Sequence, residues 1–151
     1  MSTKKNRGYL GTALGCYCPR CREGKLFKNP IAVSPKRNLE MNKNCPVCGQ
    51  ATEIEVGFYY GTGYVSYALT VAISITTLVA WWILIGFSTE DSRFFIWMGT
   101  NAVLLIFLQP WIMRLSRSLW ISWFVKFDPH WKENNASDVS ERLNTEQAGN
   151  W

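Results

Sequence analysis

Polar and apolar stretches alternate in a simple order along the chain, and two of the apolar stretches are long. The first covers residues 64–87 and the second covers residues 94–113, both without a charged side chain. At about 1.5 Å per residue these helices would reach about 36 Å and 30 Å, against a hydrocarbon core of about 30 Å. The core helix of a soluble protein is the alternative, but such a helix seldom stays apolar on every face for so long. The pattern therefore predicts two membrane spans.

The short polar break at residues 88–93 forces the two spans into an antiparallel hairpin, which we assign to residues 57–113. Small hydroxylated side chains share one face of the first span: Ser66, Thr70, Ser74 and Thr77. We expect Asn101 of the second span to hydrogen-bond to the first span, and Gln109-Pro110 to mark a kink. Neither span contains an acidic residue, a basic residue or histidine, so a proton relay is not indicated.

Residues 114–131 are expected to form an amphipathic helix. Its polar stripe consists of Arg114, Arg117, Ser118, Ser122 and Lys126, and aromatic and aliphatic residues cover the rest. This pattern is typical of a helix that lies in the headgroup layer of a membrane, and docking on another part of the chain or on a partner is the alternative. We expect His130 to lie in a solvated turn rather than in a metal or catalytic site, and residues 132–151 to be disordered.

The segment that precedes the first span ends in a run of glycines and aromatic residues, Gly57-Phe-Tyr-Tyr-Gly61-Thr-Gly63. We interpret it as an interfacial anchor with bends, and a close helix contact at the glycines is the alternative. Residues 1–15 form a basic N-terminal segment without the apolar core of a secretory signal. Such a segment either contacts anionic lipid headgroups or is a frayed terminus.

Charge follows the predicted topology. The 151-residue chain has a formal net charge of +5, and ten of its lysines and arginines precede the first span, one lies between the spans and five follow the second. The positive-inside rule then places both termini of a multi-pass membrane protein in the cytoplasm, and we expect the membrane to be the inner membrane of a bacterium. RNA binding by residues 1–55 is the alternative explanation of the basic charge, and we do not favour it because topology accounts for the same residues.

Two Cys-x-x-Cys motifs carry the only recognisable chemistry of the sequence. Twenty-three residues separate Cys18-Pro-Arg-Cys21 from Cys45-Pro-Val-Cys48, and Gly49 follows the second motif. Two such knuckles can aim four thiolates at one point, which is the ligand pattern of a zinc ribbon. We therefore predict a cytoplasmic zinc ribbon over residues 16–56, with Cys18, Cys21, Cys45 and Cys48 as ligands and Gly49 in a backbone conformation that favours glycine.

Other uses of these cysteines stay open. An iron site or a copper-handling site uses the same ligands, and the motif can also be without metal, whereas disulfides are disfavoured on the reducing side of the membrane. Cys16 is either part of a soft Cu(I) site or a small residue at the edge of the first knuckle. Short strands are expected at residues 24–27, 31–33 and 53–56, where they would close the ribbon.

Taken together, these motifs resemble the family catalogued as domain of unknown function 983. The shared residues are Cys18-Pro-x-Cys21-x-x-Gly24-Lys25-Leu26-Phe27, Cys45-Pro-x-Cys48-Gly49, Gly57-Phe-Tyr-Tyr-Gly61, and Met113-Arg-Leu-Ser-Arg-Ser. The resemblance covers about residues 16–131, and Cys16 is not part of it. Members of that family are often encoded beside haem-copper oxidase subunits and their assembly factors, so the resemblance implies a role around that enzyme.

The sequence thus predicts a non-enzymatic membrane protein, because no acid, base and nucleophile occur together. We expect an accessory subunit or an assembly factor of an inner-membrane complex, with a respiratory haem-copper oxidase as the leading partner. Membrane lipids are the other expected partner. A protein that handles copper or zinc through its thiolates is the alternative function.

Overall fold

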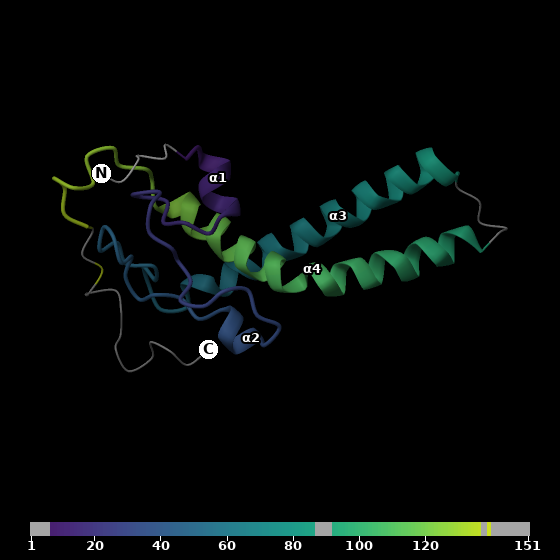
Figure 1. Ribbon diagram of the computed structural model, residues 1–151, viewed down its shortest axis with the longest axis horizontal. Helices are drawn as coiled ribbons and strands as arrows, with labels where there is room; N and C mark the ends of the chain where they lie inside the picture. The colour runs from purple at the N-terminus through teal and green to yellow at the C-terminus, as the bar shows by residue number, and fades with distance from the viewer. Residues whose placement is uncertain (1–6, 87–91, 137–138, 140–151) are drawn as a thin grey trace.

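The protein consists of a compact module and a long helical hairpin that projects from it (Figure 1). The computed structural model describes residues 7–86, 92–136 and 139. Its elements in chain order are α1 (Tyr9–Leu14), α2 (Pro35–Asn38), a 3-10 turn η1 (Phe58–Gly61), α3 (Thr62–Ile85) and α4 (Arg93–Phe124). We call residues 16–56 the cysteine module.

Both predicted apolar stretches are helical, and α3 and α4 lie side by side (Figure 1). The two apolar helices have mean hydropathies of 2.1 and 1.5 in their most apolar windows, and 0% and 6% of those windows are buried within the protein. Each helix is long enough and apolar enough to span a membrane. Most of the predicted connection at residues 88–93 lies outside the described residues.

A polar contact in the middle of the hairpin fixes the register of the two helices. The Thr77 hydroxyl donates to Asn101 Oδ1 at 2.9 Å, and Asn101 Nδ2 donates to Ser74 Oγ at 3.1 Å. This confirms the expected hydrogen bond from Asn101 to the first span.

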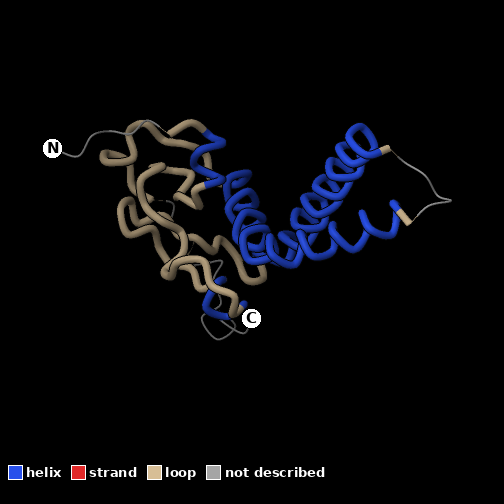
Figure 2. Tube along the Cα trace, turned by 45° about the vertical axis from the view of Figure 1, so that its right-hand side comes forward, coloured by secondary structure: helices blue, strands red, loops and turns tan. Residues whose placement is uncertain are grey.

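The helix predicted over residues 114–131 is present as far as Phe124, but it is a continuation of the second apolar helix and not a separate element. Helix α4 continues from Arg93 to Phe124 through Pro110, and it changes direction part-way along its length (Figure 2). Pro110 has no N–H for the Ile106 carbonyl, which weakens the helix at this point without ending it. The first part of the polar stripe is turned toward the protein, since Arg114 and Ser118 are buried and Arg117 is half-buried, whereas Lys126 is exposed. The alternative, docking on another part of the chain, is what the structure shows.

The last turns of α4 complete the hydrophobic core of the cysteine module. Ile121 of α4 and Val125, the residue that directly follows the helix, are buried in one cluster with Leu26, Phe27 and Phe58, together with the module's cysteines. A segment of this length is too short to bury a core of its own, so the helix supplies the apolar surface that the module lacks.

The expected strands at residues 24–27, 31–33 and 53–56 are also wrong, because the described ranges contain no strand. The chain instead forms three isolated antiparallel bridges, which join Tyr17 to Lys25, Phe27 to Met41, and Asn44 to Ala51. Loops and turns dominate this module (Figure 2), and it is held by its central cluster rather than by a sheet.

Both ends of the described chain are more ordered than the sequence indicated. Residues 9–14 form α1, in which Thr12 and Ala13 are buried, so this part is not a frayed terminus. Residues 132–135 were expected to be disordered, but the Glu133 and Asn134 amides both donate to the His130 carbonyl. The rest of both predictions, residues 1–6, 137–138 and 140–151, falls outside the described residues.

The glycines before α3 serve two different purposes. Gly57 has a φ of 78°, a left-handed conformation that supplies the expected bend. Gly61 permits a close contact, because a Cβ there would collide with the indole of Trp120 in α4. The Trp120 indole also donates to the Phe58 carbonyl at 2.7 Å. The close helix contact, the alternative interpretation, is therefore realised at Gly61.

Candidate metal centre

The structure brings together the four cysteines that the spacing singled out. The sulfurs of Cys18, Cys21, Cys45 and Cys48 all lie within 4.8 Å of one another. The Cys18–Cys48 and Cys21–Cys45 sulfur distances are both 3.7 Å, far longer than a disulfide bond of about 2.05 Å. A tetrahedral zinc with Zn–S bonds of about 2.3 Å requires S–S distances of about 3.8 Å. The thiol arrangement therefore fits a four-coordinate metal ion.

The two knuckles have the same backbone construction. In each knuckle, the backbone amide of the residue after the second cysteine donates to the carbonyl of the first cysteine. Arg22 donates to the Cys18 carbonyl at 2.8 Å, and Gly49 donates to the Cys45 carbonyl at 3.0 Å. These two residues also share a left-handed backbone, with φ of 60° at Arg22 and 72° at Gly49. Gly49 thus has the conformation that the sequence predicted for it.

Arg22 adopts this conformation as a non-glycine residue because its side chain is held on two sides. Its guanidinium lies 3.9 Å from the centre of the Phe127 ring. Arg22 also donates to the Arg7 carbonyl at 2.7 Å, and Arg7 donates back to the Arg22 carbonyl at 2.8 Å. These contacts offset a backbone cost of about 1–2 kcal/mol.

Gly24 allows the first knuckle to approach the second. A Cβ at this position would collide with the Cys45 sulfur, and the Gly24 amide lies 3.5 Å from the Cys21 sulfur, to which it donates. Gly24 therefore contributes to the site although it is not a ligand, and the sequence, which predicted a short strand at this position, did not indicate this role.

The charge of the site also suits a divalent cation. Hydrogen bonding with Cys18 lowers the pKa of Cys21 to about 6, and hydrogen bonding with Cys21 raises the pKa of Cys18 far above its usual range. Four thiolates this close together would repel one another, so they do not all lose their protons unless a cation offsets their charge. The chemistry of the donor set fits zinc and is shared by other ions that accept four thiolates.

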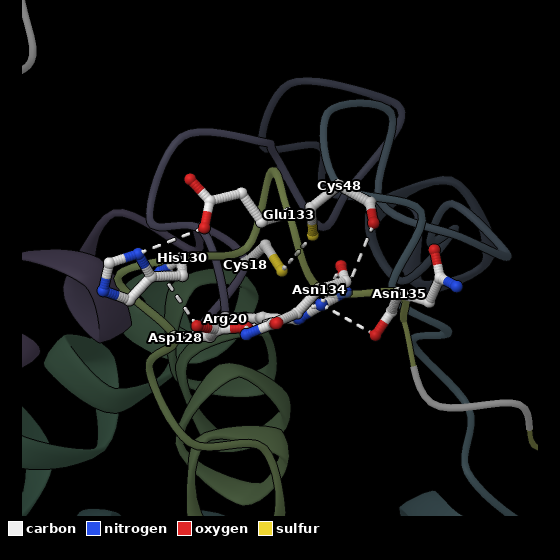
Figure 3. A network of polar contacts seen from close by, with 8 residues as sticks. All are labelled: Cys18, Arg20, Cys48, Asp128, His130, Glu133, Asn134 and Asn135. Atoms are coloured by element: carbon white, nitrogen blue, oxygen red, sulfur yellow. Dashed lines mark hydrogen bonds and ion pairs between the residues drawn. The ribbon is translucent and has the colours of Figure 1, made fainter.

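A buried arginine connects the centre to the segment that follows α4. Figure 3 shows Arg20 extended between Asp128 and the Asn134–Asn135 backbone. Its Nη2 donates to the carbonyls of Asn134 and Asn135 at 2.8 and 2.9 Å and lies 3.5 Å from Asp128 Oδ2. Its Nη1 donates to the Cys48 carbonyl at 3.5 Å. Arg20 therefore joins both knuckles to the C-terminal segment.

Two further arginines attach the module to α4. The Arg114 guanidinium donates to the carbonyls of Asn29, Pro30 and Asn38 at 2.8–2.9 Å, and it lies over the Phe27 ring at 4.6 Å. Arg117 donates to the Leu39 carbonyl at 3.1 Å. The sequence predicted lipid contacts for both residues and missed these roles, because backbone carbonyl acceptors leave no pattern in a sequence.

Cys16 and His130 lie outside the four-thiol cluster. Burial raises the pKa of the Cys16 thiol, which lies beside Arg114 and Ser118 of α4. Among the described residues the metal-ligand group contains only the other four cysteines. The His130 side chain is 71% exposed and lies 3.6 Å from Glu133, in keeping with the expected solvated turn.

In comparisons with known proteins, no family model matches this chain, and neither does any curated protein or solved structure.

Proposed function

We propose that this protein is a non-enzymatic accessory subunit or assembly factor of a complex in the bacterial inner membrane. In this proposal the cysteine module is a zinc ribbon that lies on the cytoplasmic side and provides the docking surface. The two apolar helices form a transmembrane hairpin, and both termini lie in the cytoplasm. The expected partner is a respiratory haem-copper oxidase, as the resemblance to domain of unknown function 983 implies.

The membrane assignment is supported by the exposure of the hairpin. A core helix of a soluble protein would be buried, but 0% of the most apolar window of the first helix is buried within this protein. Tyr60 and Tyr64 are 76% and 82% exposed where that helix begins. Exposed tyrosines at the end of an apolar helix are typical of the level of lipid headgroups.

The observation that carries the proposal is the continuity of α4. One helix contains the second apolar stretch, the arginines that attach the module, and Ile121 of the module's core, and Val125 of that core follows the helix directly. A displacement of the hairpin within a larger complex would therefore move the metal centre with it. This coupling suits a part that recognises a partner simultaneously in the membrane and at its surface.

The contacts of Cys16 support a structural metal rather than metal transfer. Transfer by thiol exchange would need an additional accessible thiolate near the cluster. Cys16 is instead packed against α4 beside Arg114, and burial favours its protonated form.

The test is extraction of the natively expressed protein in a mild detergent, followed by mass spectrometry of the proteins that copurify. We expect oxidase subunits in fixed proportion to this chain. Deletion of the gene should lower the amount of assembled oxidase and leave the specific activity of the remaining enzyme unchanged. Normal oxidase levels after deletion would contradict the proposal, and a lone protein that carries exchangeable copper would favour the metal-handling alternative.

A further inference from the structure

The loop of residues 29–38 in the cysteine module is fixed against α4 at both of its ends. At one end, the carbonyls of Asn29 and Pro30 accept hydrogen bonds from Arg114. At the other, the buried Asn38 donates through Nδ2 to the Pro110 carbonyl at 2.8 Å. The Ala32 amide donates to Asn38 Oδ1 at 3.2 Å, which braces the loop internally. The loop therefore has a defined position along α4.

That position is beside the apolar part of the helix. Val33 and Pro35 line a groove together with Leu105, Ile106 and Met113 of α4. Ile106 lies seven residues before the predicted end of the second span at residue 113, which is about 10 Å along a helix. In Figure 1, α2 and the chain next to it lie beside α4 on the side of the module from which the hairpin projects.

The tip of this loop is apolar, and the described part of the chain leaves it exposed. Ile31 is 58% exposed and Val33 is 90% exposed. The adjoining helix α2 carries Lys36 and Arg37, both of them exposed. An apolar tip followed by basic residues matches the order of a lipid leaflet, in which acyl chains lie below anionic headgroups.

We propose that residues 30–35 insert into the cytoplasmic leaflet of the membrane, with Lys36 and Arg37 at the level of the phosphates. The occupant of the exposed surface at Ile31 and Val33 is phospholipid. The module would then be partly embedded and would have one fixed orientation on the membrane. This inference rests on the proposed membrane hairpin, because the position of the loop is defined relative to the second span.

The test uses a photoreactive residue, p-benzoylphenylalanine, placed singly at three positions of the full chain. The variants are Val33→p-benzoylphenylalanine in the loop tip, Phe107→p-benzoylphenylalanine in α4 and Val47→p-benzoylphenylalanine in the second knuckle. Phe107 is 79% exposed in the apolar helix, and Val47 is 41% exposed beside the metal centre. Each purified variant is reconstituted in vesicles of phosphatidylethanolamine and phosphatidylglycerol and illuminated, and its mass is then measured.

We expect adducts with the mass of one phospholipid at positions 33 and 107, with a yield at least tenfold lower at position 47. Lipid adducts at 107 but not at 33 would overturn the loop inference and leave the hairpin in place. An adduct between two copies of the chain at 33, or equal yields at 33 and 47, would overturn it as well. Absence of lipid adducts at 107 would overturn the membrane hairpin itself, and the loop inference with it.

Discussion

At the scale of single residues, the geometry of the four-thiol cluster depends on a glycine as well as on the cysteines themselves. The Gly24→Ala substitution places a methyl group where the Cys45 sulfur lies. We expect metal affinity to fall by about 10- to 100-fold, as is usual when a residue that positions a ligand is changed. Competition for the metal ion with a chromogenic chelator measures the affinity of each variant.

Gly11→Ala is the matched control for that experiment, because a Cβ at Gly11 has no neighbouring atom within 4 Å. Its metal affinity should equal that of the natural protein. If the two variants bound metal with equal affinity, the close contact between Gly24 and the Cys45 sulfur would not be needed for metal binding.

The conformations and roles of single residues were predictable from the sequence where a short motif determines the local geometry. The spacing of the cysteines and the glycine after Cys48 predicted a four-thiol cluster and a left-handed turn, and both are local properties of the chain. The buried positions of Arg20 and Arg114 and the half-buried position of Arg117 were not predictable in this way. An isolated basic residue is usually solvated, and their main acceptors are backbone carbonyls distant in sequence.

At the scale of the elements, one polar contact accounts for part of the hairpin's stability. The Asn101→Leu substitution removes the hydrogen bonds to Thr77 and Ser74. We expect the free energy of unfolding in a membrane or detergent to fall by about 1 kcal/mol, in the range found for hydrogen bonds between transmembrane helices. Steric trapping of the two helices, applied to the natural protein and to the variant, measures this difference in the free energy of unfolding.

Thr100→Val serves as the control for Asn101→Leu, since the Thr100 hydroxyl donates only to the Ile96 carbonyl of its own helix. Its effect should be near zero. An equal loss of stability in both variants would mean that the interhelical contact contributes nothing specific.

The attachment of the cysteine module to α4 depends on Arg114. The Arg114→Met substitution leaves three backbone carbonyls without their donor and removes the guanidinium from the Phe27 ring. Loss of charged hydrogen bonds of this kind costs about 3 kcal/mol in total, after the gain from no longer burying a charge. We expect faster proteolysis of residues 29–38.

Lys126→Met removes a charge of the same sign from the exposed surface just beyond α4, and it should leave the proteolysis rate unchanged. Equal rates for Arg114→Met and the natural protein would show that the loop is held by other contacts.

The elements themselves were predicted in part. Long uncharged stretches indicate helices reliably, so α3 and the first part of α4 were found near their observed bounds. Helix was predicted for residues 114–124 too, but its continuity with the second span was missed because a proline and a change from apolar to basic composition both resemble a helix end. The strands were expected from alternating residues, yet the module closes with single bridges and relies on its central cluster and on α4.

At the scale of the whole molecule, the cysteine module and the hairpin are parts of one structure. The module lacks sufficient apolar residues for a core. Ile121 of α4 and Val125 directly after the helix complete that core, and the cysteines lie in the same cluster. This arrangement was not predictable from the sequence, because it depends on contacts between residues about 100 positions apart. It implies that a metal ion bound by the cysteines would also stabilise the packing of the end of α4 against the cysteine module.

The most direct test of this account is the metal content of the full-length protein extracted from membranes, measured per chain by elemental analysis. We predict one zinc ion per chain in the natural protein and in Cys16→Ser, and less than about one tenth of that in Cys45→Ser, because three thiolates hold the ion less tightly than four. Membrane-extracted protein without stoichiometric metal, or with metal that survives Cys45→Ser and is lost in Cys16→Ser, would contradict it.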